Sequence, residues 1–470
     1  MKRILACFIL IGSISVSVGQ TLVASIDLDL KKPAALHQVD INSNRETNEF
    51  YIFASDKSRI TALKFNSALF MRDSLTTSRP SEIYDFIAGQ CFSSGGNAEV
   101  YWMSENHKQI FGMQFDFENK VASTSAHQIS YDKQTYVSHF STNNAFYVVT
   151  VDNDDANLIL HEFKSAQMNQ QVLNFSETGL VKTSDKPTAL RALLEEHALV
   201  MIDTESLNPL FYCTAKIKYY LSNGKLYITA DHQLHETIVV EVNLADFSVN
   251  YKHVAQSHFE KPGKANSYLI NNKLYQIKAN EDRLEVKVTD NVTAQDSIII
   301  ANTKQSEITE KNSPFLSQTA RQTPRQIKNT ERFLRALSSS LPGISIYQTP
   351  DSKLVTIGGI SYVASSSDIL LGVAAGVGMV LTGTDLYLDG LVPNDNLRTV
   401  FYETHLDEQN RFVKKEQEIL AADKLSMFFE QQKGTSLMSV VPYRGYFIAG
   451  YYVEKENKFY LRKFSDGFED

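Results

Sequence analysis

Residues 51–65 read YIFASDKSRITALKF: an apolar run, the polar turn Asp56–Arg59, and a second run in which apolar residues recur. This pattern is typical of two β-strands joined by a hairpin. A second copy begins at Tyr101, 50 residues later, and a third begins at Tyr147, after another 46. A period of roughly 40 to 50 residues is typical of the blades of a β-propeller.

The repeat continues beyond the third copy. Further copies occupy 226–242, 274–288 and 446–464. Two gaps, 163–226 and 288–446, are long enough to contain degenerate copies, for which the candidates are Ala198–Asp203 with Leu210–Thr214 and Lys353–Gly358 with Thr399–Thr404. We therefore predict an all-β propeller of six to eight blades, with seven as the best estimate.

Other repeat and sandwich architectures fit this spacing less well. A β-sandwich has fewer, unrelated strands in each unit of roughly 100 residues, and a parallel β-helix has a much shorter period. A four-stranded sheet cannot bury both faces alone, so neighbouring blades stack around an axis. We expect Leu22–Leu30 to join the last blade and close the ring, because an open sheet edge invites aggregation.

The N-terminus carries the pattern of a secretory signal. Lys2 and Arg3 precede the apolar stretch Ile4–Gly12, and small residues at Ser17 and Gly19 suit cleavage before Gln20. The apolar stretch is shorter than the roughly 20 residues that span a bilayer. We expect residues 1–19 to be removed, leaving an exported, periplasmic or outer-envelope protein without a transmembrane span.

Charge and composition narrow the function classes. The net charge of -8 becomes -10 once Lys2 and Arg3 are removed, and no basic cluster suited to nucleic acid is evident. With 43% hydrophobic residues the chain can build a sizeable core, and its length favours a modular architecture. Cys91 and Cys213, the cysteines left after cleavage, could form one bridge or be two buried thiols.

An irregular insertion interrupts the repeat at about 302–396. Asn302–Arg325 is polar and reads as an exposed connection, and Thr330 is the expected N-cap of a helix over Glu331–Leu337. Residues 369–381 contain no charge and three glycines, which fits a buried hairpin or, alternatively, an apolar loop that docks a partner. For the docking alternative, the candidate residues are Leu370, Leu371, Val373, Val377, Met379 and Leu381.

Residues 332–347, RFLRALSSSLPGISIY, continue to KLVTIGG at 353–359. This segment resembles one found in uncharacterised exported β-propeller-like proteins of the bacterial cell envelope. The resemblance covers some thirty residues of the 470 and implies an envelope location. It carries over no catalytic residue. We treat residues 20–470 as a single propeller domain that contains the insertion.

No catalytic motif is present in the sequence: the serine-hydrolase elbow, the zinc-protease His pair and the phosphate-binding loop are all absent. Two hairpins contain metal-ligand residue types. Asp152, Asp154 and Asp155 could offer oxygens to Ca²⁺, and His232 and His235 could face one Zn²⁺. Solvated turns are the preferred interpretation of both, so we expect no metal and no cofactor.

Tyrosine recurs in the copies and carries a structural prediction. We expect these tyrosines to sit at equivalent positions and to pack one blade on the next, and we expect Trp102 to lie in the core. The residues are Tyr51, Tyr101, Tyr147, Tyr227, Tyr275 and Tyr446.

Two classes of function fit the sequence. The favoured class is a non-enzymatic binding or scaffold propeller of the cell envelope with a protein partner, because fold alone confers no activity. The alternative is a hydrolase or lyase that acts on a polysaccharide or peptide at the mouth of the channel, where loops from several blades meet. A glycan is the second class of ligand considered.

Overall fold

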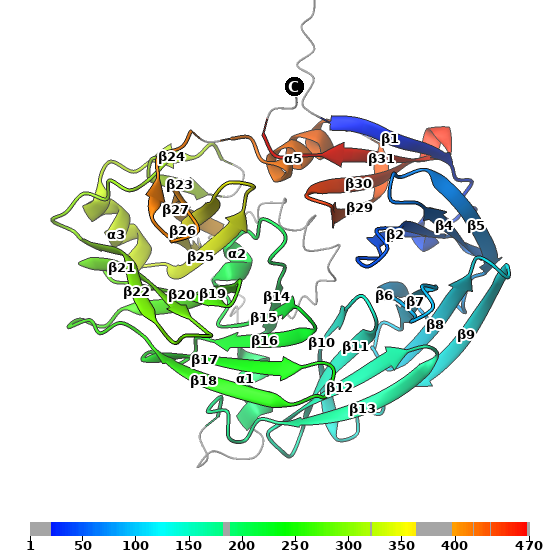
Figure 1. The fold of residues 1–470 in the computed structure, drawn as a ribbon, viewed down its shortest axis with the longest axis horizontal. Coiled ribbons are helices and arrows are strands. Elements are labelled where there is room, and N and C mark those ends of the chain that lie inside the picture. Colours follow the sequence, from blue (N-terminus) through cyan, green and yellow to red (C-terminus); the bar gives the residue numbers. More distant parts are fainter. Residues whose placement is uncertain are drawn as a thin grey trace, which may run out of the picture.

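The computed structural model describes residues 20–181, 189–319, 322–362, 397–416, 418–432 and 434–467. Within these ranges the chain forms seven β-sheets arranged in a ring around a central axis (Figure 1). The molecule is an all-β propeller, and the estimate of seven blades agrees with its sheets. The signal peptide predicted over 1–19 lies outside the described residues.

Four blades are plain four-stranded antiparallel sheets, numbered here from the channel outward. Their strands are β2 (Gln38–Ser43), β3 (Phe50–Ser55), β4 (Arg59–Phe65) and β5 (Met71–Ser78) in blade 1; β6 (Phe86–Phe92), β7 (Ala98–Met103), β8 (Gln109–Asp116) and β9 (Val121–Gln128) in blade 2; β10 (Gln134–Ser141), β11 (Phe146–Asp152), β12 (Asn157–Lys164) and β13 (Gln167–Asn174) in blade 3; and β19 (Lys264–Ile270), β20 (Lys273–Ala279), β21 (Arg283–Asp290) and β22 (Asp296–Thr303) in blade 5.

The other three blades depart from that plan. Blade 4 has β14 (Leu199–Ile202) inside β15 (Ile217–Ser222), β16 (Lys225–Ala230), β17 (Glu236–Asn243) and β18 (Val249–Ala255); blade 6 has β25 (Leu341–Gln348), β26 (Lys353–Tyr362) and β27 (Leu397–Leu406), with β23 (Leu316–Thr319), β24 (Arg325–Gln326) and β28 (Phe412–Val413) outside; blade 7 has β29 (Thr435–Tyr443), β30 (Tyr446–Val453), β31 (Lys458–Phe464) and β1 (Gln20–Asp27).

Helices are few among the described residues, and none of them is long and apolar enough to cross a membrane. They are α1 (Ala189–Glu196), α2 (Leu210–Cys213), α3 (Thr330–Ser338) and α5 (Ala421–Gln431), with short 3-10 turns η1 (Ala34–Leu36) and η3 (Glu454–Glu456).

The sequence repeat corresponds to the middle hairpin of each blade. Residues 51–65 fall in β3 and β4, and the other copies fall in the second and third strands of blades 2, 3, 4, 5 and 7. Every residue of β3 and of β7 is buried, because these strands are covered on both faces by neighbouring blades. The outermost strand β9 has mostly exposed or half-buried residues instead.

The first described strand closes the ring. In β1, Gln20 pairs with Phe464 and Asp27 pairs with Lys458 of β31, in antiparallel register. The closure predicted for Leu22–Leu30 is therefore confirmed, with β1 ending at Asp27.

The two gaps in the repeat have different contents. The gap after Val288 contains blade 6, as expected. The described residues of the gap after Phe163 form no further blade: Leu199–Ile202 is a strand, but it adds to blade 4 by pairing in parallel with β15. The strand expected at Leu210–Thr214 is wrong, because these residues form α2, which begins directly after Pro209.

The helix predicted over Glu331–Leu337 is confirmed as α3, and its Phe333, Leu334 and Leu337 are buried. Its N-cap is Asn329, whose side chain accepts the backbone N–H of Arg332 at 3.2 Å. Thr330 was the wrong cap, because its hydroxyl accepts the N–H of Ile308 at 2.9 Å instead.

Asn302–Arg325, expected to be an irregular connection, contains β23. This strand pairs with β27 at the outer side of blade 6. Part of the expected connection, Leu316–Thr319, is therefore a strand of the blade 6 sheet.

Residues 199–213, here called the channel segment, lie on the inner side of the ring between blades 4 and 6. Their helix α2 packs against β25 and β26, and Figure 1 shows it inside these strands. Asn208 links two blades, since its Nδ2 donates to Tyr268 Oη at 3.1 Å and its carbonyl accepts from Ser345 Oγ at 2.6 Å. Gly343 allows this close approach, because a Cβ there would lie 2.7 Å from Thr214 Cγ2.

Candidate functional site

The ring has two faces that differ in which turns they carry. Because the strands of a blade run alternately up and down, turns between first and second strands and between third and fourth strands share one face, here called the 1–2 face. Turns between second and third strands lie on the other, here called the 2–3 face. β26 ends at Tyr362 and β27 begins at its partner Leu397, and both residues lie at the 2–3 face.

The six partner-docking candidates, Leu370, Leu371, Val373, Val377, Met379 and Leu381, lie outside the described residues. The docking hypothesis for this segment stays a prediction.

The aspartate hairpin of blade 3 is a hydrogen-bonded turn. Asp152 Oδ1 accepts the backbone N–H groups of Asp154 and Asp155 at 2.9 and 3.2 Å. One of the three carboxylates is thereby engaged with the backbone, as turn chemistry favours.

His232 and His235 follow the fully buried Asp231 in the turn between β16 and β17. His232 is half-buried and His235 is exposed. Across the part of the chain that the structure describes, no three His, Cys, Asp or Glu side chains come together as a metal-binding group.

Asp231 belongs to a buried ion pair that the sequence did not reveal. Lys218 Nζ lies 2.9 Å from Asp231 Oδ2, and both side chains are fully buried. Thr237 and Ser267 each donate a hydroxyl to Asp231 at 2.7 Å, and Lys218 also donates to Asn266 Oδ1 at 2.6 Å. Burial alone would raise the pKa of Asp231, but Lys218 and these hydroxyls hold it below its usual value. The pair is fully satisfied and links blades 4 and 5.

A buried histidine lies on the inner strand of blade 3. His139 Nδ1 is 2.6 Å from Tyr136 Oη, and His139 Nε2 is buried without a partner in the described residues. Burial lowers the pKa of His139 to about 3, and His107 adds to that effect. His139 is therefore neutral at neutral pH, and its burial keeps it from acting on a ligand in solution.

The inner wall of blades 1, 2 and 7 is polar. Asp40 on β2 accepts hydrogen bonds from Gln90 Nε2 of blade 2 and, at 3.5 Å, from Ser439 Oγ of blade 7. On the 1–2 face, Arg45 Nη1 lies 2.8 Å from Glu205 Oε1 of the channel segment, so this segment contacts blade 1 across the axis. Each carboxylate here is engaged by a partner within the chain.

The recurring tyrosines pack between blades, as predicted. Tyr101, for example, stacks on Phe146 of blade 3 with ring centroids 5.1 Å apart, and Tyr51 contacts Phe92 of blade 2 at the same centroid distance. Their positions are not all equivalent in register: Tyr51 and Tyr147 are the second residues of their strands, and Tyr101 is the fourth. What they share is the face directed at the following blade.

The hydroxyls of three of these tyrosines donate hydrogen bonds to glutamates. Tyr51, Tyr101 and Tyr147 donate to Glu49, Glu99 and Glu162 at 2.9, 2.7 and 3.0 Å. A phenylalanine would leave each acceptor short of one hydrogen bond. Trp102 is completely buried, as expected. Cys91 and Cys213 are two free, buried thiols, and burial raises the pKa of Cys213 to about 12.

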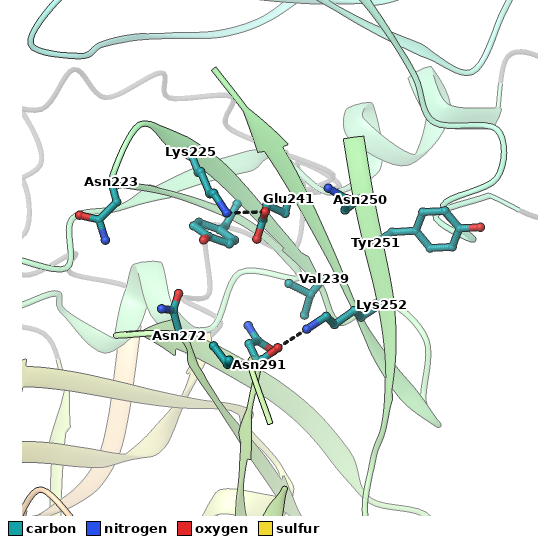
Figure 2. A pocket seen from close by; sticks show the side chains of 11 residues that line it. Asn223, Lys225, Val239, Glu241, Asn250, Tyr251, Lys252, Asn272 and Asn291 are labelled. Carbon is teal, nitrogen blue, oxygen red and sulfur yellow. Dashed lines mark hydrogen bonds and ion pairs between the residues drawn. The ribbon is translucent and has the colours of Figure 1, made fainter. Parts of the chain in front are cut away.

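A surface pocket of about 220 Å³, here called the rim pocket, opens between blades 4 and 5 on the 1–2 face. Figure 2 shows its polar side chains approaching from both blades, with Lys225 paired to Glu241 and Lys252 donating to Asn291. The sequence offered one weak signal for it, the asparagines of two tight turns. The lining residues are Asn223, Lys225, Tyr227, Val239, Glu241, Asn250, Tyr251, Lys252, Asn272, Asn291 and Val292.

Comparison with known proteins finds similar solved structures but no similar sequence. No family model and no curated protein matches the sequence. Among solved structures, the chain is similar to the Dos1 propeller (TM-score 0.32, 8% identity, 96% of this chain and 97% of that one). It is also similar to the WD40 domain of SCAP from fission yeast (TM-score 0.31, 9% identity, 95% of this chain and 97% of that one). A third similar structure is an oligogalacturonate lyase in complex with manganese (TM-score 0.34, 8% identity, 94% of this chain and 97% of that one).

Likenesses at this level assign no ligand, partner or activity. The class of the protein follows from the strand pairing of the chain itself: it is a β-propeller whose first strand closes its last blade.

Proposed function

We propose that this protein is an exported binding or scaffold propeller of the cell envelope, and that it docks a protein partner on its 2–3 face. The observation that carries the proposal is the channel segment. It covers the inner side of blades 4 to 6 with the chain's own residues, so this part of the inner wall is used for packing.

The ionisable groups support the same assignment. Buried ionisable groups of blades 3 and 4, among them His139 and the Lys218–Asp231 pair, are engaged by contacts within the chain. A general acid or base must lie within hydrogen-bond distance of its substrate and have a pKa near the pH at which the enzyme works. A hydrolase or lyase at the channel mouth gains no specific support from these residues.

The partner surface that we propose includes the connection between Tyr362 and Leu397. Its sequence contains the uncharged stretch 369–381, and an apolar patch on a secreted protein is a common docking site. Scaffold propellers bind through loops that a rigid ring positions. An envelope protein is the proposed partner, and a glycan is the second class of ligand.

The test uses the chain from Gln20 onward. In one variant a short linker replaces residues 368–393. In a second variant of unchanged length, Leu370, Leu371, Val373, Val377, Met379 and Leu381 become serine. We expect reciprocal affinity capture from cell envelopes to recover the same defined protein with the parent chain, and both variants to lose it while their thermal unfolding midpoints stay unchanged.

A matched control replaces the exposed Val121 and Val172 on outer strands with serine and should retain the partner. Retention of the partner by both insertion variants would contradict the proposal. Export is tested by fractionation of cells: accumulation of the parent chain in the cytoplasm with residues 1–19 attached would contradict it.

A further inference from the structure

The rim pocket between blades 4 and 5 has a surplus of unused hydrogen-bonding groups. Among the described residues, the side-chain amides of Asn223, Asn250 and Asn272 are exposed and form no hydrogen bond within the chain. A primary amide offers two donor hydrogens and one acceptor oxygen. These exposed amides can exchange their hydrogen bonds to water for hydrogen bonds to a bound ligand.

Turn geometry accounts for some of these asparagines but not for their convergence. Asn272 has a φ of 59°, a left-handed conformation that asparagine tolerates, and Asn223 precedes Gly224 in another tight turn. Asn250, however, lies on strand β18, and its extended backbone does not call for asparagine. The amides come from three separate strands and turns of two blades and meet at one pocket.

The pocket also carries one cation without an acidic partner. Lys225 Nζ is neutralised by Glu241 Oε1 at 2.7 Å. Lys252 donates to the backbone carbonyl of Asn291, and no carboxylate of the described residues lies within ion-pair distance of it. The two lysines and one glutamate therefore leave a net charge of +1 at the pocket, which favours an anionic ligand.

The size and lining of the pocket narrow the class of ligand. A volume of about 220 Å³ is smaller than the roughly 300–1,000 Å³ of pockets that enclose drug-sized molecules. Val239 and Val292 add apolar surface beside the amides, while the ring of Tyr251 points away from the other side chains in Figure 2. A ligand with several hydroxyls, a small apolar face and one carboxylate matches these groups.

We propose that this pocket binds one acidic monosaccharide unit of a polysaccharide, with Lys252 meeting the carboxylate and the asparagine amides meeting the hydroxyls. The inference deepens the proposed binding role, since it gives the glycan a site of its own. That site lies on the 1–2 face, opposite the proposed protein-docking face.

The experiment titrates the chain from Gln20 onward with two tetrasaccharides in a calorimeter: one containing glucuronate, prepared from hyaluronan, and a neutral one, cellotetraose. We expect the acidic sugar to bind at least tenfold more tightly than the neutral one. Lys252→Met should weaken its binding at least tenfold, and Asn250→Ala should weaken it several-fold.

Arg72→Met is the matched control, because Arg72 is an exposed cation on β5, which is the outermost strand of blade 1 as β18 is of blade 4. It should leave the affinity unchanged, and circular dichroism should show that all variants are folded. Absence of binding to both sugars, equal binding of the two, or binding that Lys252→Met and Asn250→Ala leave intact would overturn the proposal.

The variant with a linker in place of residues 368–393 separates the two proposals. It should bind the acidic sugar as tightly as the parent chain even though it has lost the protein partner. Loss of sugar binding in this folded variant would place the glycan site elsewhere and overturn the inference.

Discussion

The buried polar residues of this propeller form hydrogen bonds and ion pairs with one another across the interfaces between blades. Lys218 and Asp231 are the clearest case, since both charges are fully buried and each has further hydrogen bonds. Sequence alone could not reveal the pair, because Lys218 and Asp231 look like ordinary residues of a strand and a turn. Only the packing of blade 5 against blade 4 removes both from water.

Lys218→Met should therefore destabilise the protein strongly. The substitution leaves the Asp231 carboxylate buried without a cation, which costs about 3–5 kcal/mol. Urea unfolding measures the loss. Lys225→Met, which breaks the partly exposed pair with Glu241, is the control and should cost less than about 1 kcal/mol. Equal losses in the two variants would mean that burial of the first pair has no energetic consequence.

The buried histidines make stability depend on pH. The pKa of His139 is lowered to about 3 and that of His161 to about 4, each mainly by burial, against about 6.5 in the unfolded chain. Between these values the unfolded state binds more protons, so stability falls as the pH decreases from about 6.5. Each histidine should contribute a loss of about 2 kcal/mol between pH 7 and pH 5.

His139→Gln provides the check on this pH dependence. We expect the variant to show a smaller difference in the free energy of unfolding between pH 7 and pH 5, measured in urea at both pH values. An unchanged difference would show that His139 does not carry the effect.

Secondary-structure elements were predictable from sequence where their partners are near in the chain. Each middle hairpin joins two strands through a short polar turn, so its alternating pattern contains both partners, as in residues 51–65. The channel segment lacked such a signal, because α2 packs on β25 and β26, more than a hundred residues later. The rim pocket was missed for the same reason: Lys252 and Asn291 belong to different blades.

The cap of α3 gives a test at this scale. Asn329→Ala removes the side chain that accepts the N–H of Arg332, and loss of an N-cap costs about 1 kcal/mol. We expect thermal unfolding to shift downward accordingly. Asn329→Asp, which keeps an acceptor at the N-terminus of the helix, should preserve stability. A loss of equal size in the aspartate variant would assign the effect to something other than the cap.

The whole ring depends on one long-range pairing. β1 and β31 join the two ends of the described chain, so blade 7 contains three strands from one end and one from the other. The prediction of closure succeeded because a ring of blades leaves an unpaired edge unless a distant strand covers it. The blade count succeeded because six of the seven blades contain a clear copy of the repeat, and the longer of the two gaps has room for the seventh.

Deletion of residues 20–27 should open the ring. The edge of β31 would be left unpaired, and we expect a lower unfolding midpoint and concentration-dependent association in light scattering. A synthetic peptide of residues 20–27 added in excess should restore the midpoint, while a scrambled peptide should not. A deletion variant that unfolds like the parent chain would show that the closure contributes no stability.

The pairing of β1 with β31 also fixes the order of events during biosynthesis. Residues 20–27 leave the ribosome before every other strand of the ring, but their partner strand ends at Phe464, so blade 7 cannot assemble until Phe464 has been added. Contacts of such long sequence separation form slowly. Until then the chain exposes two unpaired strand edges that can associate with other chains, and a helper that shields them would raise the yield of native protein.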